Sequence, residues 1–332
     1  MKAIYITQGG NSRALHAGEL PTPEIQHNKQ ILVKIQAAGV NPIDTKIRNS
    51  PERFPVTLPA IPGCDAAGIV QAVGSNITNF KPGDEVYFSQ PGFNNRQGTY
   101  AEYVTVDASL VALKPENLSF EQAASMPLVF ITAWEALYDR AGMKTGQKIL
   151  IHAGAGGVGH IAVQLAKIAG TEVCTTVSTN KKANFVKQLG ADNIVLYKNN
   201  PVQEAIMTWT GNEGVDIAFD TVGGPVLESC FACTKVYGDV VTLLQPDVNI
   251  NWTEARKRNL RFSMELMLSP VMLELEKAKQ HQGNILRQCT ELFEAGKLQT
   301  PHIKVYSLAD AANAHDYLEQ QHPMGKVVLT ID

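Results

Sequence analysis

The chain has few cysteines and no long apolar stretch. Five cysteines among 332 residues do not form a disulfide framework, which favours a reducing compartment. The longest apolar runs, such as residues 31–33, are far shorter than the roughly 20 residues that span a bilayer. Residues 1–6 are typical of a strand and lack the apolar stretch of a signal peptide. These absences predict a cytoplasmic protein with no membrane partner.

The chain also lacks an excess of basic residues. Its 29 lysines and arginines against 32 aspartates and glutamates give a net charge of −3. Domains that hold nucleic acid usually carry a clear basic excess, so we expect no nucleic-acid partner. Hydrophobic residues at 44% and charged residues at 18% are typical of a globular chain, and the length suits about two domains.

The pattern of hydrophobic residues changes near residue 120. Before this point, short β-type runs alternate with turn residues, which is typical of a β-barrel or sandwich. After it, strands and helices alternate, which predicts a doubly wound parallel sheet in an α/β chain. The strands expected first are 31–35, 67–73, 85–88 and 99–106, and those expected later are 148–151, 172–177, 193–197, 215–220, 238–243 and 326–330. The expected helices are 120–126, 131–140 (with Pro127 between these two), 159–169, 181–189, 202–208, 226–233, 270–278 and 285–295.

The sharpest motif is a glycine loop. The residues Gly154, Ala155, Gly156, Gly157, Val158 and Gly159 have the spacing G-x-G-x-x-G and lie between an expected strand and an expected helix. Glycines permit a tight turn and a close approach of the backbone to a pyrophosphate, which the helix N-terminus attracts. The sequence therefore predicts a dinucleotide site. The alternative is a turn without a ligand, although three glycines at this spacing are costly without a reason.

The end of the next expected strand indicates which nucleotide binds. NAD sites place an acidic residue about 20 positions beyond the loop, where it binds the ribose hydroxyl. This chain has Ser178 there, followed by Lys181 and Lys182. Hydroxyl and ammonium groups favour a 2′-phosphate, so we predict NADPH as the coenzyme. The alternative is that the two lysines only begin a solvated helix.

Several segments carry a resemblance to a known family. Residues 39–44 (GVNPID), 62–68 (PGCDAAG) and 81–86 (KPGDEV) resemble the GroES-like catalytic domain of the medium-chain dehydrogenase/reductase superfamily. Residues 127–134 are similar to the helix that leads into the cofactor domain of that superfamily. The motif Asn-Pro-x-Asp points to the zinc-free quinone oxidoreductase, or zeta-crystallin-like, branch.

The resemblance covers essentially the whole chain and implies a domain organisation. A GroES-like β-barrel catalytic domain is expected from residues 1–126 and 265–332. A Rossmann NADP-binding domain is expected between them, at residues 127–264.

The zinc ligands of the family's zinc-dependent members are missing. Where those members have a cysteine three residues before the motif Asp, this chain has Asn41, and where they have Gly-His-Glu, it has Gly63-Cys64-Asp65. No cysteine occurs in residues 88–100, where a structural zinc lobe would lie. A catalytic zinc needs three protein ligands, so we expect no metal. The only C-x-x-C, at Cys230 and Cys233, is expected to be a pair of buried helix cysteines.

The resemblance also implies which residues form the catalytic site. Asn41, Asp44 and Thr132 are expected around the nicotinamide and the substrate. Asn41 before Pro42 has the alternative of a turn residue, and Asp44 has the alternative of a helix cap.

On the adenosine side, the resemblance places a second set of residues. Ser178, Lys182 and Tyr197 are expected around the 2′-phosphate and the adenine, and Val222, Leu243 and Leu244 beside the cofactor. Tyr197 has the alternative of an exposed aromatic at a strand end, and the three apolar residues have the alternative of core packing.

The reaction follows from the absence of zinc ligands. Reversible alcohol oxidation lacks its Lewis acid, whereas hydride transfer to a quinone or an α,β-unsaturated carbonyl leaves an enolate that needs only a donor or water. We therefore predict an NADPH-dependent quinone or enone oxidoreductase. Quinone reductases of the branch often have tyrosines after the motif Asp, where this chain has Lys46, Arg48, Arg53 and Phe54, which argues against a quinone. The alternatives are a zinc-independent alcohol or carbonyl dehydrogenase and a nucleotide-binding protein with secondary catalysis.

An assembly is also expected. The strand 238–243 is a plausible edge of the parallel sheet, and an apolar edge invites pairing with another chain. Family members commonly form dimers through that edge, so a homodimer is predicted.

Overall fold

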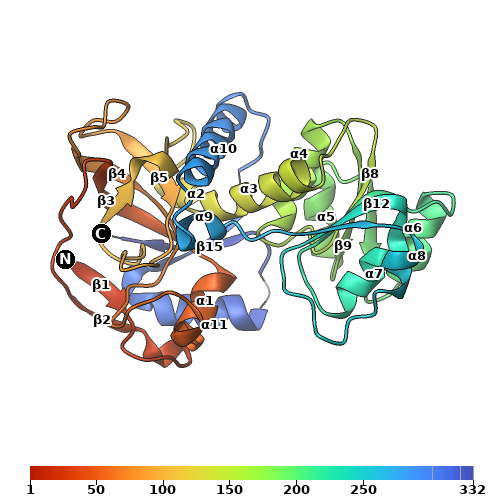
Figure 1. The fold of residues 1–332 in the computed structure, drawn as a ribbon, viewed down its shortest axis with the longest axis horizontal. Coiled ribbons are helices and arrows are strands. Elements are labelled where there is room, and N and C mark those ends of the chain that lie inside the picture. Colours follow the sequence, from red (N-terminus) through yellow and green to blue (C-terminus); the bar gives the residue numbers. More distant parts are fainter. Residues whose placement is uncertain (301, 322, 332) are drawn as a thin grey trace. The chain divides into compact units, whose positions relative to one another are not determined.

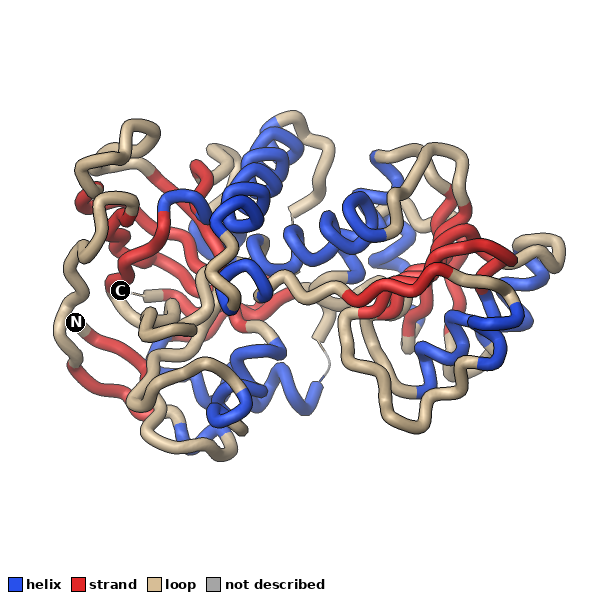
Figure 2. Tube along the Cα trace, viewed as in Figure 1, coloured by secondary structure: helices blue, strands red, loops and turns tan. Residues whose placement is uncertain are grey.

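The computed structural model describes residues 1–300, 302–321 and 323–331, which form two compact units. The terminal unit consists of Met1–Ile131 and Leu268–Asp332, and the central unit of Thr132–Met267. Both units combine strands and helices (Figure 2).

The terminal unit is built on a mostly antiparallel sheet. Its strands follow the order β14-β15-β3-β4-β5-β7, and β6 pairs with β3. β15, near the end of the chain, lies between β14 and β3 and is antiparallel to β3. The strands are β1 (Lys2–Tyr5), β2 (His16–Glu19), β3 (Gln30–Val40), β4 (Asp65–Val73), β5 (Glu85–Ser89), β6 (Tyr103–Asp107), β7 (Val111–Leu113), β14 (Ile303–Ser307) and β15 (Lys326–Thr330). Side chains of β3 alternate between the two faces of the sheet, and Ile31, Val33 and Ile35 are fully buried on one face.

The helices of the terminal unit cover this sheet. They are α1 (Pro42–Asn49), α2 (Phe120–Ala124), α9 (Ser269–Met272), α10 (Glu276–Glu294) and α11 (Ala311–Gln321). α2 packs on β3 and β4, and the long α10 packs on β7 (Figure 1).

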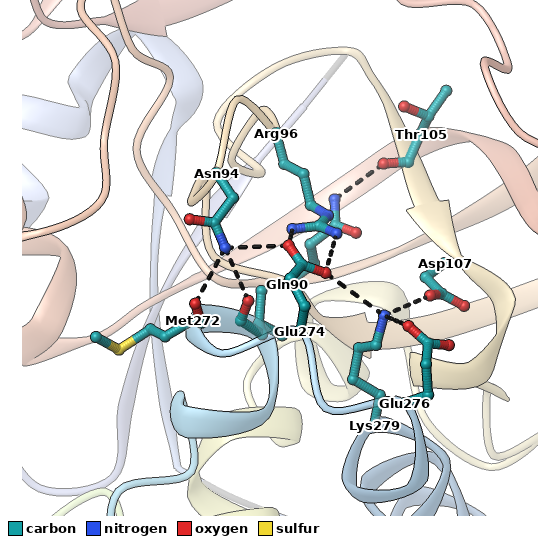
Figure 3. Close-up of polar contacts among 10 residues, drawn as sticks. Gln90, Asn94, Arg96, Thr105, Asp107, Met272, Glu274, Glu276 and Lys279 are labelled. Carbon is teal, nitrogen blue, oxygen red and sulfur yellow. Dashed lines mark hydrogen bonds and ion pairs between the residues drawn. The ribbon is translucent and has the colours of Figure 1, made fainter.

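Polar side chains fasten the loop that precedes β6 to the segment between α9 and α10 (Figure 3). Arg96 donates two hydrogen bonds to the carboxylate of Glu274, at 2.7 and 2.8 Å. The amide of Asn94 donates to two backbone carbonyl groups of α9, at 3.1 and 3.2 Å. Lys279, on α10, donates to Asp107 at the end of β6, at 2.9 Å. The loop contains no cysteine, and charged and amide groups hold it in place.

The central unit is built on a six-stranded sheet in which every neighbouring pair is parallel. The strands, in the order β10-β9-β8-β11-β12-β13, are β8 (Lys148–Ile151), β9 (Glu172–Val177), β10 (Asn193–Leu196), β11 (Val215–Asp220), β12 (Thr234–Thr242) and β13 (Arg261–Met264). The helices are α4 (Gly159–Ile168), α5 (Asn180–Gln188), α6 (Val202–Trp209), α7 (Pro225–Cys233) and α8 (Thr253–Lys257). Figure 1 shows α4 on one face of the sheet and α7 on the other. The alternation predicted for this part of the chain is confirmed.

Some predicted boundaries were wrong. Pro127 does not lie in a gap before the second helix but begins it, as the first residue of α3 (Pro127–Trp134), because proline suits the first helical position, whose N–H has no intrahelical partner. The chain continues from α3 into a π-helical segment, Glu135–Arg140. The strand expected at 99–106 begins only at Tyr103, and the helix expected at 270–278 is interrupted between Met272 and Glu276.

The prediction that residues 238–243 form a sheet edge was also wrong. β12 lies between β11 and β13, and β13 pairs with it from Arg261 to Met264. β13 is a four-residue strand that begins with an exposed arginine, so its hydrophobic pattern is too short to predict a strand. One edge of the parallel sheet is therefore β13.

Cys230 and Cys233 lie buried in α7, as expected, within a core that includes Leu150, Ala218 and Phe231. No helix in the described ranges combines the length and the apolar character that a bilayer crossing requires.

Candidate functional site

The glycine loop joins β8 to α4 and is held against β9. The backbone N–H groups of Ala153 and Gly154 donate to the hydroxyl and the carbonyl oxygen of Thr176, at 3.0 and 3.2 Å. A Cβ atom at Gly154 would overlap Thr175 Oγ1, whereas one at Gly156 would meet only Ala153 O, at 3.2 Å. Glycine at position 154 is therefore required for the close approach of the loop to β9, and the loop is open at Gly156.

The loop presents donors to a ligand. Among the described residues, no hydrogen-bond acceptor is found for the backbone N–H groups of Gly157, Val158 and Gly159 at the start of α4. Such N–H groups and the positive end of the helix dipole attract an anion. The residues thus fit the pyrophosphate of a dinucleotide, and no side chain caps the helix in its place.

The predicted cofactor residues all follow the carboxyl ends of adjacent parallel strands. The glycine loop follows β8, Ser178 follows β9, Tyr197 follows β10, Val222 follows β11, and Leu243 with Leu244 follows β12. The strand order reverses between β8 and β11, and ligands of open α/β sheets bind at such a switch point. The structure thus brings the predicted residues to one edge of one sheet.

The side chains at this edge differ in exposure. Tyr197 is 49% exposed and Val222 45% exposed, which does not suit the alternative of core packing for Val222. Leu243 and Leu244 are partly buried, and Leu244 packs against Gly223.

Lys182 is half-buried in the first turn of α5, four positions after Ser178. Burial lowers the pKa of Lys182, and the neighbouring Lys198 ammonium lowers it further, to a smaller extent. Two ammonium groups that repel one another are stabilised by an anion between them. Lys198 directly follows Tyr197 and was not predicted as a site residue, because its proximity to Lys182 depends on the pairing of β9 with β10.

Asp220 is a further residue of this edge that the sequence analysis did not assign to the site. Its buried carboxylate accepts hydrogen bonds from the N–H groups of Val222 and Gly223, at 2.9 and 2.8 Å, and from the hydroxyl of Thr242, at 2.8 Å. Asp220 therefore fixes the loop that carries Val222 to the end of β12.

Asn41 and Asp44 lie in the terminal unit, at the start of α1, and both are completely buried. The amide of Asn41 donates to Asp65 Oδ2 at 2.9 Å and accepts a hydrogen bond from the Lys326 ammonium. This pairing fixes the orientation of the amide, with its oxygen toward the cation and its nitrogen toward the carboxylate. Asp44 accepts the backbone N–H of Asn41 at 2.8 Å, so the alternative role of a helix cap is realised as well.

Burial perturbs the acidic groups of this cluster. It raises the pKa of Asp44 to about 7, although hydrogen bonds from the Asn41 N–H and the Cys64 thiol lower it. It raises the pKa of Asp65 to about 6, against the lowering effects of the Lys326 ammonium and of hydrogen bonds that include the Leu128 N–H at the start of α3. Burial lowers the pKa of Lys326. Perturbed groups of this kind are typical of functional sites.

Thr132, the third predicted catalytic residue, lies in the central unit on α3, where it is 5% exposed. A cavity of about 370 Å³ in the terminal unit is lined by β1, β2 and the end of β15, and none of the predicted site residues lines it.

The cluster around Asn41 does not fit a zinc ion. A fully buried lysine ammonium bonds the amide oxygen of Asn41, at the position where a zinc protein has a cysteine. A second cation beside it would be repelled. In the part of the chain that the structure describes, no three His, Cys, Asp or Glu side chains are grouped to hold a metal ion.

Family models match both units of the chain. The model for the alcohol dehydrogenase GroES-like domain matches residues 27–116, and the model for zinc-binding dehydrogenase matches residues 189–329. The predicted fold class, a GroES-like domain with a parallel Rossmann-type domain, is confirmed.

Individual relatives match nearly the whole chain. A zinc-type alcohol dehydrogenase-like protein of Staphylococcus aureus (strain COL) is 33% identical over 97% of this chain and 96% of its own length. The chloroplastic NADPH-dependent alkenal/one oxidoreductase of Arabidopsis thaliana is 33% identical over 99% of this chain and 79% of its own length. The structure of Escherichia coli quinone oxidoreductase complexed with NADPH covers 100% of both chains at 29% identity, with a TM-score of 0.87. The chain is therefore an oxidoreductase that belongs to the medium-chain dehydrogenase/reductase superfamily, within its quinone oxidoreductase branch.

Proposed function

We propose that the protein uses NADPH to reduce α,β-unsaturated carbonyl compounds, with quinones as a second substrate class, and that it needs no zinc. The observation that carries the proposal is the convergence of the glycine loop, Ser178 and Lys182 at the carboxyl edge of one parallel sheet.

Coenzyme choice rests on the groups near Ser178. This position has a hydroxyl and not the carboxylate that binds the ribose of NAD. Lys182 and Lys198 lie close enough to repel one another at this edge of the sheet, and a 2′-phosphate would form charge-assisted hydrogen bonds with these ammonium groups. The similarity to a quinone oxidoreductase complexed with NADPH and to an NADPH-dependent alkenal/one oxidoreductase supports the same coenzyme.

The chain's residues have distinct roles in this proposal. The N–H groups at the start of α4 would hold the pyrophosphate, and Asp220 holds the loop of Val222 in place. Bound NADPH supplies a hydride from its nicotinamide ring. We assign Asn41, Asp44 and Thr132 to the surroundings of the nicotinamide and the substrate. Asn41 and Asp44 are completely buried, so a substrate reaches them only after a neighbouring segment moves.

The absence of a zinc requirement rests on Asn41 and Lys326. Hydrogen bonds from the Lys326 ammonium and to the Asp65 carboxylate fix the amide of Asn41, and the described residues offer no set of three metal ligands around it. Alcohol oxidation would then lack the Lewis acid that zinc provides. Reduction of a conjugated double bond does not need one, because the enolate that forms takes a proton from a donor or from water.

A panel of acceptors tests the proposal. NADPH oxidation is measured with enones, quinones and saturated ketones, and NADP+ reduction with alcohols, in the presence of a chelator. We expect turnover with enones, weaker turnover with quinones and none with saturated ketones. Activity only with alcohols and only after addition of zinc would overturn the reaction and the metal assignment. Binding of NADPH without turnover of any acceptor would favour the nucleotide-binding alternative.

A further inference from the structure

A chain of buried side chains leads from the surface of the terminal unit to Asp44. Glu319 accepts two hydrogen bonds from Arg48, at 3.0 and 3.2 Å. Arg48 Nη1 lies 3.2 Å from His315 Nδ1, and His315 Nε2 lies 3.1 Å from the Tyr100 hydroxyl. That hydroxyl lies 3.2 Å from Asp44 Oδ2. This chain of hydrogen bonds joins α1, α11 and the segment before β6, which lie far apart in the sequence.

Arg48 determines the direction of every hydrogen bond in this chain. A guanidinium has no acceptor, so His315 Nδ1 must accept from it. The neutral imidazole then carries its hydrogen on Nε2 and donates to Tyr100. The hydroxyl hydrogen of Tyr100 is left to point at Asp44. Burial and the Arg48 charge lower the pKa of His315 to about 3, which keeps the ring neutral.

The other groups that face Asp44 complete its surroundings. The Cys64 thiol donates to Asp44 Oδ1 at 3.2 Å, and burial raises the pKa of this thiol well above its usual value, so it keeps its hydrogen. Burial raises the pKa of the Tyr100 phenol in the same way. Asp65 faces Asp44 with a like charge and Lys326 with an opposite one. Three donors, from Asn41, Cys64 and Tyr100, therefore point at one buried carboxylate.

We propose that Arg48, His315 and Tyr100 are positioning residues whose one-way chain of hydrogen bonds favours the ionised form of Asp44 and sets the pH at which it takes up a proton. None of the three needs to touch the substrate. Arg48 holds the tautomer of His315, His315 occupies the acceptor side of Tyr100, and Tyr100 donates to Asp44. The pH dependence of the reaction then depends on residues remote from the reacting atoms. This last consequence rests on the proposed function, whereas the effect on Asp44 does not.

The substitution Tyr100→Phe removes the donor and keeps the ring. We expect the pKa of Asp44 to rise by about one unit, since hydrogen bonds to charged groups are the stronger ones. Infrared difference titration of the protein without coenzyme measures the carboxyl band, which is assigned by its loss in Asp44→Asn. The matched control is Tyr87→Phe, since Tyr87 is an equally buried tyrosine whose hydroxyl donates to the Leu286 carbonyl oxygen at 2.6 Å. We expect no shift in the control.

Substitutions of His315 test the chain beyond Tyr100. His315→Leu should shift the Asp44 titration in the same direction as Tyr100→Phe. His315→Gln should restore part of the shift, because its amide N–H can replace the imidazole donor. An unchanged titration in Tyr100→Phe, or an equal shift in Tyr87→Phe, would overturn the proposal.

Activity measurements separate this proposal from the proposed function. If the protein reduces enones with NADPH, the apparent pKa of the acid limb of its pH–rate profile should rise in Tyr100→Phe. The rise should equal the shift measured in the infrared titration. A shifted carboxyl titration in a protein without reductase activity would retain the positioning chain and reject the function. An active enzyme whose carboxyl titration and pH–rate profile are both unchanged in Tyr100→Phe would retain the proposed function and reject the positioning chain.

Discussion

Coenzyme preference depends on single side chains at the end of β9. We predict that Lys182→Ala weakens NADPH binding about tenfold, because a charge-assisted contact at a half-exposed site is worth roughly 1.5 kcal/mol. NADH binding should change little, since NADH has no 2′-phosphate. The matched control is Lys181→Ala, which removes an exposed neighbouring charge. Titration of coenzyme fluorescence at low and high salt measures both constants, and the NADPH effect should shrink at high salt. Preference of the wild type for NADH would contradict the assignment of this site.

His152 makes the stability of the protein depend on pH. Burial lowers its pKa to about 4, from about 6.5 in an unfolded chain. The neutral ring therefore contributes stability above pH 6.5, and this contribution is lost as the pH falls toward 4, because only the unfolded chain takes up the proton.

The variant His152→Gln should lose this dependence. Its unfolding free energy should fall less steeply than that of the wild type below pH 6.5, by up to about 1.4 kcal/mol per pH unit. Urea unfolding at several pH values between 4.5 and 7.5 measures the slopes. His27→Gln, at an exposed position, is the control and should keep the wild-type slope. Parallel curves for His152→Gln and the wild type would show that His152 is protonated in the folded protein.

Some residues of the candidate site could be predicted from the sequence and others could not. Asn41, Asp44 and the residues at the ends of the parallel strands belong to local motifs, so their types and spacing indicated them. Arg48, Tyr100 and His315 have no shared local motif, because 267 positions separate Arg48 from His315 and 215 separate Tyr100 from His315. Arg48 entered the sequence analysis only as a departure from the tyrosines of related quinone reductases.

At the scale of elements, the glycine loop has a restrictive geometry at Gly154. Gly154→Ala should destabilise the protein by about 1–3 kcal/mol, because the new methyl group overlaps Thr175 and must displace the loop or β9. Gly156→Ala should leave the unfolding free energy within about 1 kcal/mol and still weaken coenzyme binding, since its methyl group would project into the open side of the loop. Thermal unfolding and coenzyme titration of both variants separate the two effects. Equal stability of the two variants would contradict the described packing of the loop on β9.

Most elements of the central unit followed from periodicity, since β8, β9 and β11 have the predicted bounds. The failures have local causes. β13 is short and begins with a charged residue, and β14 and α11 were not predicted. The helix predicted at 131–140 began too late, because a proline at the first helical position cannot be told apart by sequence from a proline that ends a helix.

For the whole molecule, the position of β13 changes the expected dimer interface. We predict a homodimer that pairs through β13, whose backbone groups on one side have no partner strand in the described chain. Met264 and Leu266, at and just beyond its end, are 50% and 49% exposed. The double substitution Met264→Lys and Leu266→Lys should give a monomer of 36.1 kDa by light scattering, whereas we expect the wild type to have twice that mass. Val248→Lys, at a 96% exposed loop position outside this strand, should remain dimeric. A wild type that scatters as a 36.1 kDa particle at micromolar concentration would rule out the dimer.

In the proposed reaction, hydride passes from NADPH to the electron-poor carbon of a conjugated double bond without zinc. NADPH carrying deuterium at the transferred position of its nicotinamide is incubated with an enone and a chelator, and the product is analysed by nuclear magnetic resonance. We predict a saturated ketone with deuterium on the carbon β to the carbonyl group. An allylic alcohol with deuterium on the former carbonyl carbon, or activity that appears only after zinc is added, would contradict the account.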